Sequence, residues 1–199
     1  MTRLCDKSDS MHILIISEGF YPETDARASR MTEHARHWVA MGHTVTVVCA
    51  APNFPRGIVY DGYQNVWRAT TVEEGVTVHR IWSFISPNKG IVRRLASFLC
   101  FTVMALWHGW RVTRYEKPDI ILGTCPSLFA PCAAGLLARI RKRPFVFEVR
   151  DLWPESAVGI GMVRENSVPY RVMERIARWL YTSADMLVPS GRRLCRPSG

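Results

Sequence analysis

The sequence predicts an α/β fold built on a doubly wound, mostly parallel sheet. Short apolar runs rich in β-branched residues alternate with longer segments of helical period along nearly all of the 199 residues. This alternation is typical of α/β proteins. The joints between the segments are short, so we expect consecutive strands to pair in parallel through right-handed crossovers.

The apolar runs give the strands in order. The first, "HILIIS", and the second, "TVTVVCA", have the β-branched composition of buried strands. Strands are expected at 12–17, 44–50, 66–72, 76–82, 119–124, 144–149 and 185–190. The pair 66–72 and 76–82 flanks the turn "EEG" and predicts a hairpin or two adjacent strands.

The helices follow from the 3.6-residue period. In the segment after the first strand, Ala28, Met31 and Ala35 fall on one face, and Gly42 is a stop signal. Helices are expected at 27–42, 91–117, 128–141 and 167–184, and a loop at 51–66.

The chain divides into one domain with two short tails. Residues 1–11 are polar, without the apolar core of a signal peptide, and are expected to be a disordered tail. Residues 12–190 suit a single domain with a sizeable core. Residues 191–199 carry no apolar period and form an atypical tail.

The charge balance favours an anionic partner. Lys and Arg number 26 against 17 Asp and Glu, for a net charge of +9. The basic residues are spread along the chain and no recognition motif occurs, so we do not expect nucleic-acid binding. The six cysteines include no CxxC pair, which favours structural thiols in a reducing compartment over disulfides or metal.

The sequence lacks the motifs of several common classes of enzyme and binding site. A Rossmann-like sheet that binds a dinucleotide needs a glycine-rich turn after its first strand, but "SEGFYPETDARASR" contains one glycine. No GxSxG elbow occurs, which disfavours an α/β-hydrolase. His34 and His37 lie three apart without a third ligand beside them, so neither a metal site nor a cofactor is expected.

In the stretch "FVFEVRDLWPES" (145–156), charged residues follow directly after an apolar run that is typical of a buried strand. In open α/β sheets, ligands bind outside the carboxyl ends of the strands. A site at that edge would contain Arg150 and Asp151. The alternative is a solvated strand end, in which this pair caps the next turn.

Three stretches carry a resemblance to a known family: residues 21–63 with the loop "APNFPRG", residues 117–156 with "RDLWPES", and residues 174–190. Over 12–190 the chain resembles the N-terminal domain of a family-four retaining glycosyltransferase of the GT-B fold. It is most similar to bacterial transferases of colanic-acid and O-antigen type.

The resemblance implies a hexosyltransferase type of enzyme that moves a sugar from a nucleotide-sugar donor to a lipid-linked glycan. The process would be bacterial surface-polysaccharide (exopolysaccharide or O-antigen) biosynthesis. Family members are about twice as long, and their C-terminal donor-binding domain is absent here. We therefore expect a truncated or frameshifted chain with an incomplete nucleotide-sugar site and no turnover alone. A non-catalytic membrane- or partner-binding remnant is the alternative, and a nucleotide-dependent oxidoreductase is disfavoured.

The resemblance also implies site residues. The acceptor side would comprise the first loop, the loop after the second strand, and one residue after the "RDLW" turn: Gly19, Tyr21, Thr24, Asp25, Arg27, Asn53, Arg56 and Glu155. Thr24 and Asp25 stand where relatives often carry a glycine pair. The catalytic candidates are Arg150 and Asp151. Arg150 stands where many relatives place a histidine; it cannot act as a base but could hold a phosphate. Asp151 could orient Arg150 or accept a proton from the acceptor hydroxyl.

The segment 91–117 has the pattern of a membrane-interface helix. Its apolar run, 95–107, has about 13 residues, fewer than the roughly 20 that span a bilayer. Arginine and tryptophan at its ends suit an interface with anionic lipid: Arg93, Arg94, Trp107, Trp110 and Arg111. We expect a cytoplasmic protein, peripheral on the cytoplasmic face of the inner membrane. The alternative is a core helix with snorkelling arginines.

Overall fold

The computed structural model describes residues 10–87, 90–125, 127–159, 161 and 163–190. Its strands are β1 (His12–Ile16), β2 (Thr44–Ala50), β3 (Arg68–Glu73), β4 (Val76–Ile81), β5 (Ile120–Thr124), β6 (Phe145–Val149) and β7 (Met186–Pro189). Its helices are α1 (Ala26–Ala40), α2 (Ile91–Tyr115), α3 (Phe129–Arg141), α4 (Glu155–Gly159) and α5 (Val168–Ser183). The expected tail 191–199, and residues 1–9 of the other tail, lie outside the described residues.

The seven strands form one sheet in the order β3-β4-β2-β1-β5-β6-β7. All neighbours pair in parallel except β3 and β4, which form an antiparallel hairpin, one of the two arrangements expected. The fold class predicted from the sequence is therefore confirmed. The strand order reverses direction at β1, whose two neighbours are β2 and β5. Such a switch point is where open α/β sheets form a crevice for a ligand, outside the carboxyl ends of the strands.

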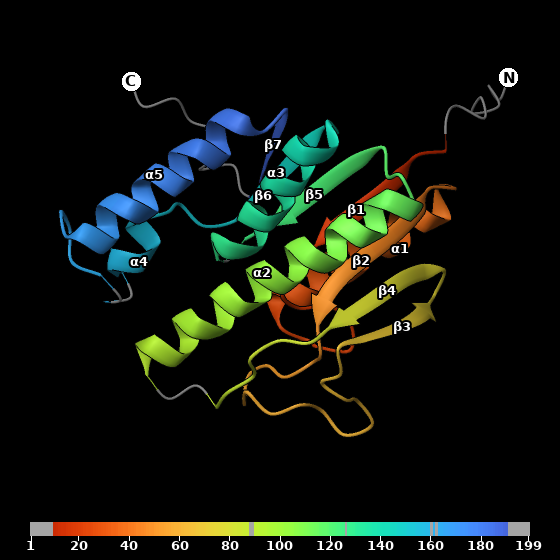
Figure 1. The fold of residues 1–199 in the computed structure, drawn as a ribbon, viewed down its shortest axis with the longest axis horizontal. Coiled ribbons are helices and arrows are strands. Elements are labelled where there is room, and N and C mark those ends of the chain that lie inside the picture. The colour runs from red at the N-terminus through yellow and green to blue at the C-terminus, as the bar shows by residue number, and fades with distance from the viewer. Residues whose placement is uncertain (1–9, 88–89, 126, 160, 162, 191–199) are drawn as a thin grey trace, which may run out of the picture.

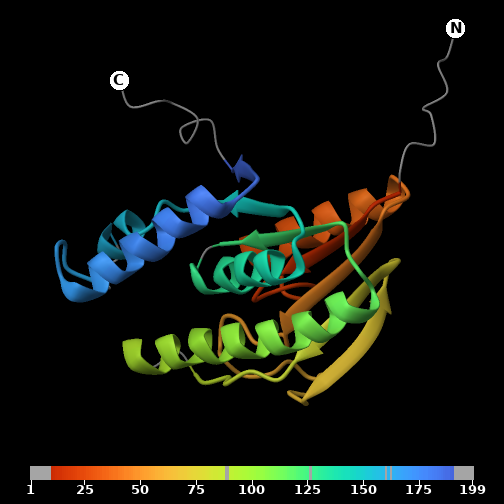
Figure 2. The ribbon, with the colours of Figure 1, turned by 45° about the horizontal axis from the view of Figure 1, so that its top comes forward.

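Helices cover both faces of the sheet (Figures 1 and 2). Along β1, alternate side chains supply the two cores. Leu14 and Ile16 pack toward α2 and α3, whereas Ile13 and Ile15 pack toward α1. All four are 3% exposed or less. The crossover helices thus lie on opposite sides of the strand tips.

Gly123 shows how closely α3 lies on the sheet. A Cβ at this position would lie 2.8 Å from the backbone of Pro131 and from the Cβ of Ala134. The close approach of helix and strand therefore requires glycine at this point of β5. It places the start of α3 against the tip of β5, at the edge where the candidate site lies.

The expected helices and strands all form, with bounds within two residues of the prediction. Asp25 is the N-cap of helix α1, and its carboxylate accepts a hydrogen bond from the Arg27 backbone N–H. The sequence pattern did not predict α4, because five residues are too few to show a helical period.

Candidate functional site

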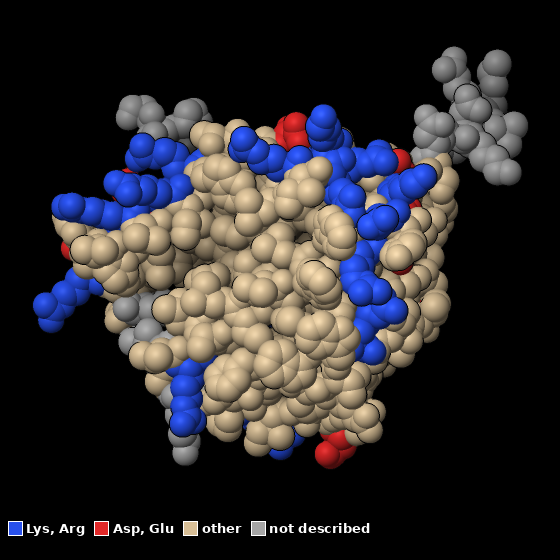
Figure 3. Space-filling model, in the orientation of Figure 1, with Lys and Arg blue, Asp and Glu red and all other residues tan. Residues whose placement is uncertain are grey.

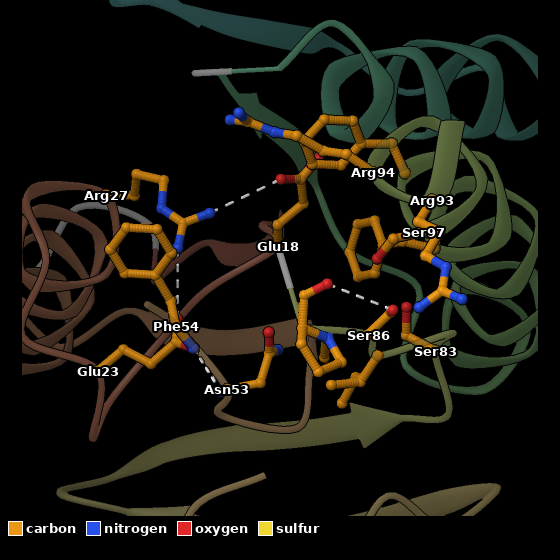
Figure 4. A pocket seen from close by; sticks show the side chains of 15 residues that line it. Glu18, Glu23, Arg27, Asn53, Phe54, Ser83, Ser86, Arg93, Arg94 and Ser97 are labelled. Atoms are coloured by element: carbon orange, nitrogen blue, oxygen red, sulfur yellow. Dashed lines mark hydrogen bonds and ion pairs between the residues drawn. The ribbon is translucent and has the colours of Figure 1, made fainter. Parts of the chain in front are cut away.

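Two adjoining cavities lie at the carboxyl edge of the sheet. Their volumes are about 210 and 420 Å³. We call them together the edge cleft, and both are lined by Glu18, Arg27, Phe54, Arg94 and Phe98. The loops after β1 and β2 form one side and the start of α2 the other, as Figure 4 shows for the smaller cavity.

Glu18 stands at the centre of the edge cleft, just beyond the tip of β1. Its carboxylate accepts a hydrogen bond from the Ser127 hydroxyl and lies 3.8 Å from Nη1 of Arg27. Burial raises the pKa of Glu18 above its ordinary value, although the hydrogen bond from Ser127 and the charge of Arg27 act in the opposite direction. The site therefore contains a carboxyl group that retains its proton more readily than an exposed one.

Arg27 is fixed in the first turn of α1 by surrounding groups. Its Nε lies 2.8 Å from Oδ1 of Asp25, and its guanidinium lies 4.3 Å from the centre of the Phe54 ring. Burial acts to lower the pKa of Arg27, but the hydrogen bond and charge of Asp25, with the nearby carboxylates, raise it overall. For Asp25, burial opposes ionisation, yet its bonds with Arg27 lower the pKa. Arg27 therefore remains charged and oriented.

Glu23 joins the two loops on this side of the cleft. Its Oε1 accepts hydrogen bonds from the backbone N–H groups of Asn53, at 2.7 Å, and Phe54, at 2.8 Å. Burial raises its pKa despite these bonds. The Asn53 side chain in turn donates to the carbonyl of Ala51. The carboxylate thereby holds the loop after β2 against the loop after β1.

Of the expected acceptor-side residues, Asp25, Arg27 and Asn53 line the edge cleft. Gly19 contributes by its lack of a side chain, since a Cβ there would overlap the Glu23 carboxylate. The others do not line it. Tyr21 lines a separate small hollow near Arg36. Thr24, Arg56 and Glu155 are exposed elsewhere on the surface.

The two catalytic candidates, Arg150 and Asp151, differ in their position relative to the edge cleft. Asp151 lines the larger cavity, whereas Arg150 lines neither cavity of the cleft. Nη1 of Arg150 is buried and has no hydrogen-bond partner among the described residues. Within the same residues no ion pair joins Arg150 to Asp151. In the described part of the chain Asp151 therefore does not orient Arg150 through an ion pair, and the catalytic assignment of both residues stays a prediction.

Glu148, the carboxylate in the middle of the charged stretch, has a structural role. It is 3% exposed, and its Oε1 lies 2.7 Å from Nε of Arg30. The Thr124 hydroxyl donates a hydrogen bond of 2.6 Å to it. A buried carboxylate needs such partners, and these link α1 to β5 and β6.

Sequence reasoning missed part of the cleft. Glu18 and Glu23 stand in no motif, although Glu18 lies two residues after the end of β1. Arg93 and Arg94, expected at a membrane interface, also line the cleft. The topology could have indicated this: α2 follows β4, whose carboxyl end lies at the same edge, so the first turn of α2 must begin there.

The outer face of α2 is apolar. Exposed side chains recur every three or four residues: Val92, Leu95, Leu99, Val103, Trp107 and Trp110. We call these six the α2 stripe. Figure 3 shows a broad uncharged surface here, bordered by Lys and Arg. Arg114 and Arg141 lie over the Trp110 ring, at 5.9 and 5.4 Å.

By length and composition alone, the stretch Val92–Tyr115 could cross a membrane. This stretch has 24 residues and contains the apolar run 95–107 expected from the sequence. One third of its apolar window is buried inside the protein. Core helices of soluble proteins satisfy the same criterion, so this stretch does not by itself establish a membrane span.

Reactive cysteines and groups of metal ligands are two further kinds of site that the described part of the chain could contain. There, Cys49, Cys100, Cys125 and Cys132 are free. Burial raises the pKa of Cys49 and of Cys132 to about 12, so these thiols are not reactive at neutral pH. No group of three or more His, Cys, Asp or Glu side chains in these residues could hold a metal ion.

Two curated proteins are similar to this chain in sequence. The colanic acid biosynthesis glycosyl transferase WcaI of Escherichia coli K12 is 28% identical over 152 residues, 76% of this chain and 37% of that protein. The probable glycosyltransferase WbjE of Pseudomonas aeruginosa is 35% identical over 111 residues, 55% of this chain and 28% of that protein. The chain thus matches well under half the length of either relative.

Two solved structures share the fold. One is Arabidopsis thaliana UGT89C1 complexed with UDP-L-rhamnose, with a TM-score of 0.56 and 14% identity over 92% of this chain and 42% of that one. The other is a UDP-N-acetylglucosamine 2-epimerase from Listeria monocytogenes, with a TM-score of 0.50 and 12% identity over 93% of this chain and 40% of that one. At these identities the likeness concerns the fold alone.

The family itself is shown by the match to a family model. The model of the glycosyl transferase 4-like domain matches residues 28–194, which is most of the chain and includes most of α1 and every later helix and strand. The chain therefore belongs to the glycosyl transferase 4-like family.

Proposed function

We propose that this chain is the acceptor-side domain of a glycosyltransferase of bacterial surface-polysaccharide biosynthesis, acting on a lipid-linked glycan. One observation carries the proposal: the edge cleft lies at the switch point of the sheet and combines carboxylates, guanidinium groups and aromatic rings. Family membership and the names of the two bacterial relatives support it.

The edge cleft has the groups that a sugar requires. Carboxylates such as Glu18 accept hydrogen bonds from hydroxyl groups, and the guanidinium of Arg27 donates them. The rings of Phe54, Phe98 and Trp153 offer apolar surface to a sugar ring. We assign the reacting sugar of the acceptor to this cleft.

The proposed reaction transfers a sugar from a nucleoside diphosphate sugar, the donor, to a hydroxyl group of the acceptor. The acceptor oxygen bonds to the anomeric carbon of the donor, the bond from that carbon to the phosphate oxygen breaks, and the nucleoside diphosphate leaves. Asp151, in the larger cavity, accepts the proton of the hydroxyl. Arg150 lines neither cavity, so the proposed step gives it no contact with the donor phosphate.

The α2 stripe is proposed to rest on the membrane that carries the acceptor. Its apolar side chains have the 3- to 4-residue spacing of an interfacial helix, and the arginines around it suit anionic headgroups. The protein would then be peripheral on the cytoplasmic face of the inner membrane, with the edge cleft opening beside the first turn of α2.

The proposal also holds that this chain by itself binds the acceptor without transferring a sugar to it. The test uses the purified 199-residue chain, a dodecyl glycoside as acceptor analogue and UDP-glucose as donor. We expect calorimetric binding of the glycoside, weakened by Glu18→Gln, and no transfer. Transfer would contradict the absence of turnover. Vesicle binding without glycoside binding would instead support the non-catalytic membrane-binding remnant.

A further inference from the structure

One arginine of the edge cleft is free of partners. On one side of the smaller cavity, Arg27 is held by carboxylates. On the other side, Arg93 has neither an ion pair nor a hydrogen bond with any described residue, although it lines the same cavity. A solvated arginine in such a place remains available to an incoming anion.

Three serine hydroxyl groups share this side of the cavity, those of Ser83, Ser86 and Ser97, of which that of Ser86 donates a long hydrogen bond of 3.4 Å to the carbonyl of Pro87. Figure 4 shows Ser83 and Ser86 on the same side as the Arg93 guanidinium, and Ser97 lies one helical turn after Arg93. The backbone of Ser83 is held by two hydrogen bonds with the Asn65 amide, of 2.8 and 3.1 Å. Ser83 is 3% exposed, yet its hydroxyl makes no hydrogen bond within the described residues.

The loop after β2 fixes this side of the cavity. Gly57 has a φ of 64°, and a Cβ there would overlap the carbonyl group of Ser86. The loop that carries Asn53 and Phe54 therefore packs directly on the segment that carries the serines. In Figure 4 the carboxylates of Glu18 and Glu23 lie nearer to Arg27 than to Arg93.

We propose that Arg93, with Ser83, Ser86 and Ser97, binds the phosphate or diphosphate group of a lipid-linked acceptor. An unpaired guanidinium beside hydroxyl donors is the arrangement that recognises phosphate oxygens. This inference rests on the proposed function, and it assigns to the cleft the Arg93 side chain that sequence reasoning assigned to the membrane.

The position of Arg93 also orders the parts of such an acceptor. Toward the sheet lies the part of the cleft assigned to the sugar. On the other side, Val92 and Leu95 begin the α2 stripe, and they are 80% and 40% exposed. A ligand with a sugar, a phosphate and an apolar chain in that order would place the sugar in the cleft, the phosphate at Arg93 and the apolar chain on the α2 stripe.

The test measures binding to the full 199-residue chain by calorimetry, with geranyl diphosphate, inorganic diphosphate and UDP as probes. Arg93→Gln is expected to weaken binding of geranyl diphosphate about tenfold. Arg175→Gln is the matched control, since it removes the same charge from an exposed position on α5 outside the cleft, and it should leave the affinity unchanged. Far-UV circular dichroism checks that both variants are folded.

Each outcome of this test supports or contradicts the proposed phosphate site. Equal affinity in the wild type and Arg93→Gln, or equal losses in both variants, would overturn the site. Tighter binding of UDP than of geranyl diphosphate, lost in Arg93→Gln, would assign the anion to the donor and overturn the lipid assignment. If the dodecyl glycoside binds while the diphosphate is insensitive to Arg93, this inference fails and the proposed function stands. If neither ligand binds, both fail.

Discussion

The Glu23 carboxylate accepts a hydrogen bond of 2.7 Å from the backbone N–H of Asn53, across 30 residues of sequence. This contact, with its neighbour at Phe54, joins two loops that would otherwise end separately at the edge of the sheet. The shape of the edge cleft on this side therefore depends on one buried side chain.

Replacing Glu23 should be costly for that reason. Glu23→Ala leaves two backbone N–H groups without their acceptor, and we expect a loss of about 2 kcal/mol in the free energy of unfolding. Glu23→Gln retains one acceptor oxygen and should lose less than half as much. Urea unfolding measures both, with exposed Glu33→Ala as a control expected to change stability by under about 0.5 kcal/mol. Equal effects of Glu23→Ala and Glu33→Ala would contradict the role of the contact.

Glu18 should make stability depend on pH. Its raised pKa means that the folded protein binds this proton more tightly than the unfolded chain does. The stability from the protonated carboxyl is then complete below the ordinary pKa of 4.5 and is lost as the pH rises through the raised value. In Glu18→Gln this dependence is absent.

The measurement is urea unfolding at about pH 4 and about pH 7.5. The wild type, compared with Glu18→Gln, should be relatively less stable at the higher pH. Asp25 has a lowered pKa and acts in the opposite direction, since its contribution is lost as the pH falls. Comparing the two Glu18 forms at each pH cancels the Asp25 contribution. A difference that does not change with pH would show that Glu18 titrates normally.

Gly123 should not tolerate a side chain. Gly123→Ala places a Cβ 2.8 Å from the backbone of Pro131, so α3 must shift away from β5, and we expect a loss of about 1–3 kcal/mol. Gly159→Ala is the matched control: it has nothing within 4 Å of the added Cβ and lies in α4, where alanine favours the helix. Thermal unfolding of both variants decides, and an unchanged midpoint for Gly123→Ala would refute the close packing.

The α2 stripe should govern membrane binding. Val103→Glu together with Trp107→Glu places two carboxylates on side chains that are 64% and 49% exposed. Because both are already in solvent, the fold should persist while binding to vesicles of anionic lipid falls at least tenfold. Val72→Glu on β3, 71% exposed, is the control. Co-sedimentation that is equally weakened by all three changes would indicate a general charge effect.

The sequence was sufficient for the sheet and the main helices because buried strands and amphipathic helices each leave a periodic pattern. It was insufficient for side-chain placement at the edge. Arg150 and Asp151 follow the end of β6, and the chain bends at Asp151, so no strand or helix period indicates where either side chain points. Arg93 and Arg94 flank an apolar stretch and so indicated a membrane, whereas the position of β4 brings them to the cleft. Glu23 carries no signal, because its partners are backbone groups 30 residues away.

The helices that bear Arg27 and Arg93 pack on opposite faces of the sheet (Figure 2). Neither helix can slide toward the other, because the strands stand between them and each packed layer occupies about 10 Å. The thickness of the domain therefore fixes the distance between the Arg27 and Arg93 sides of the edge cleft. A ligand that contacts both arginines would have to match that distance in length.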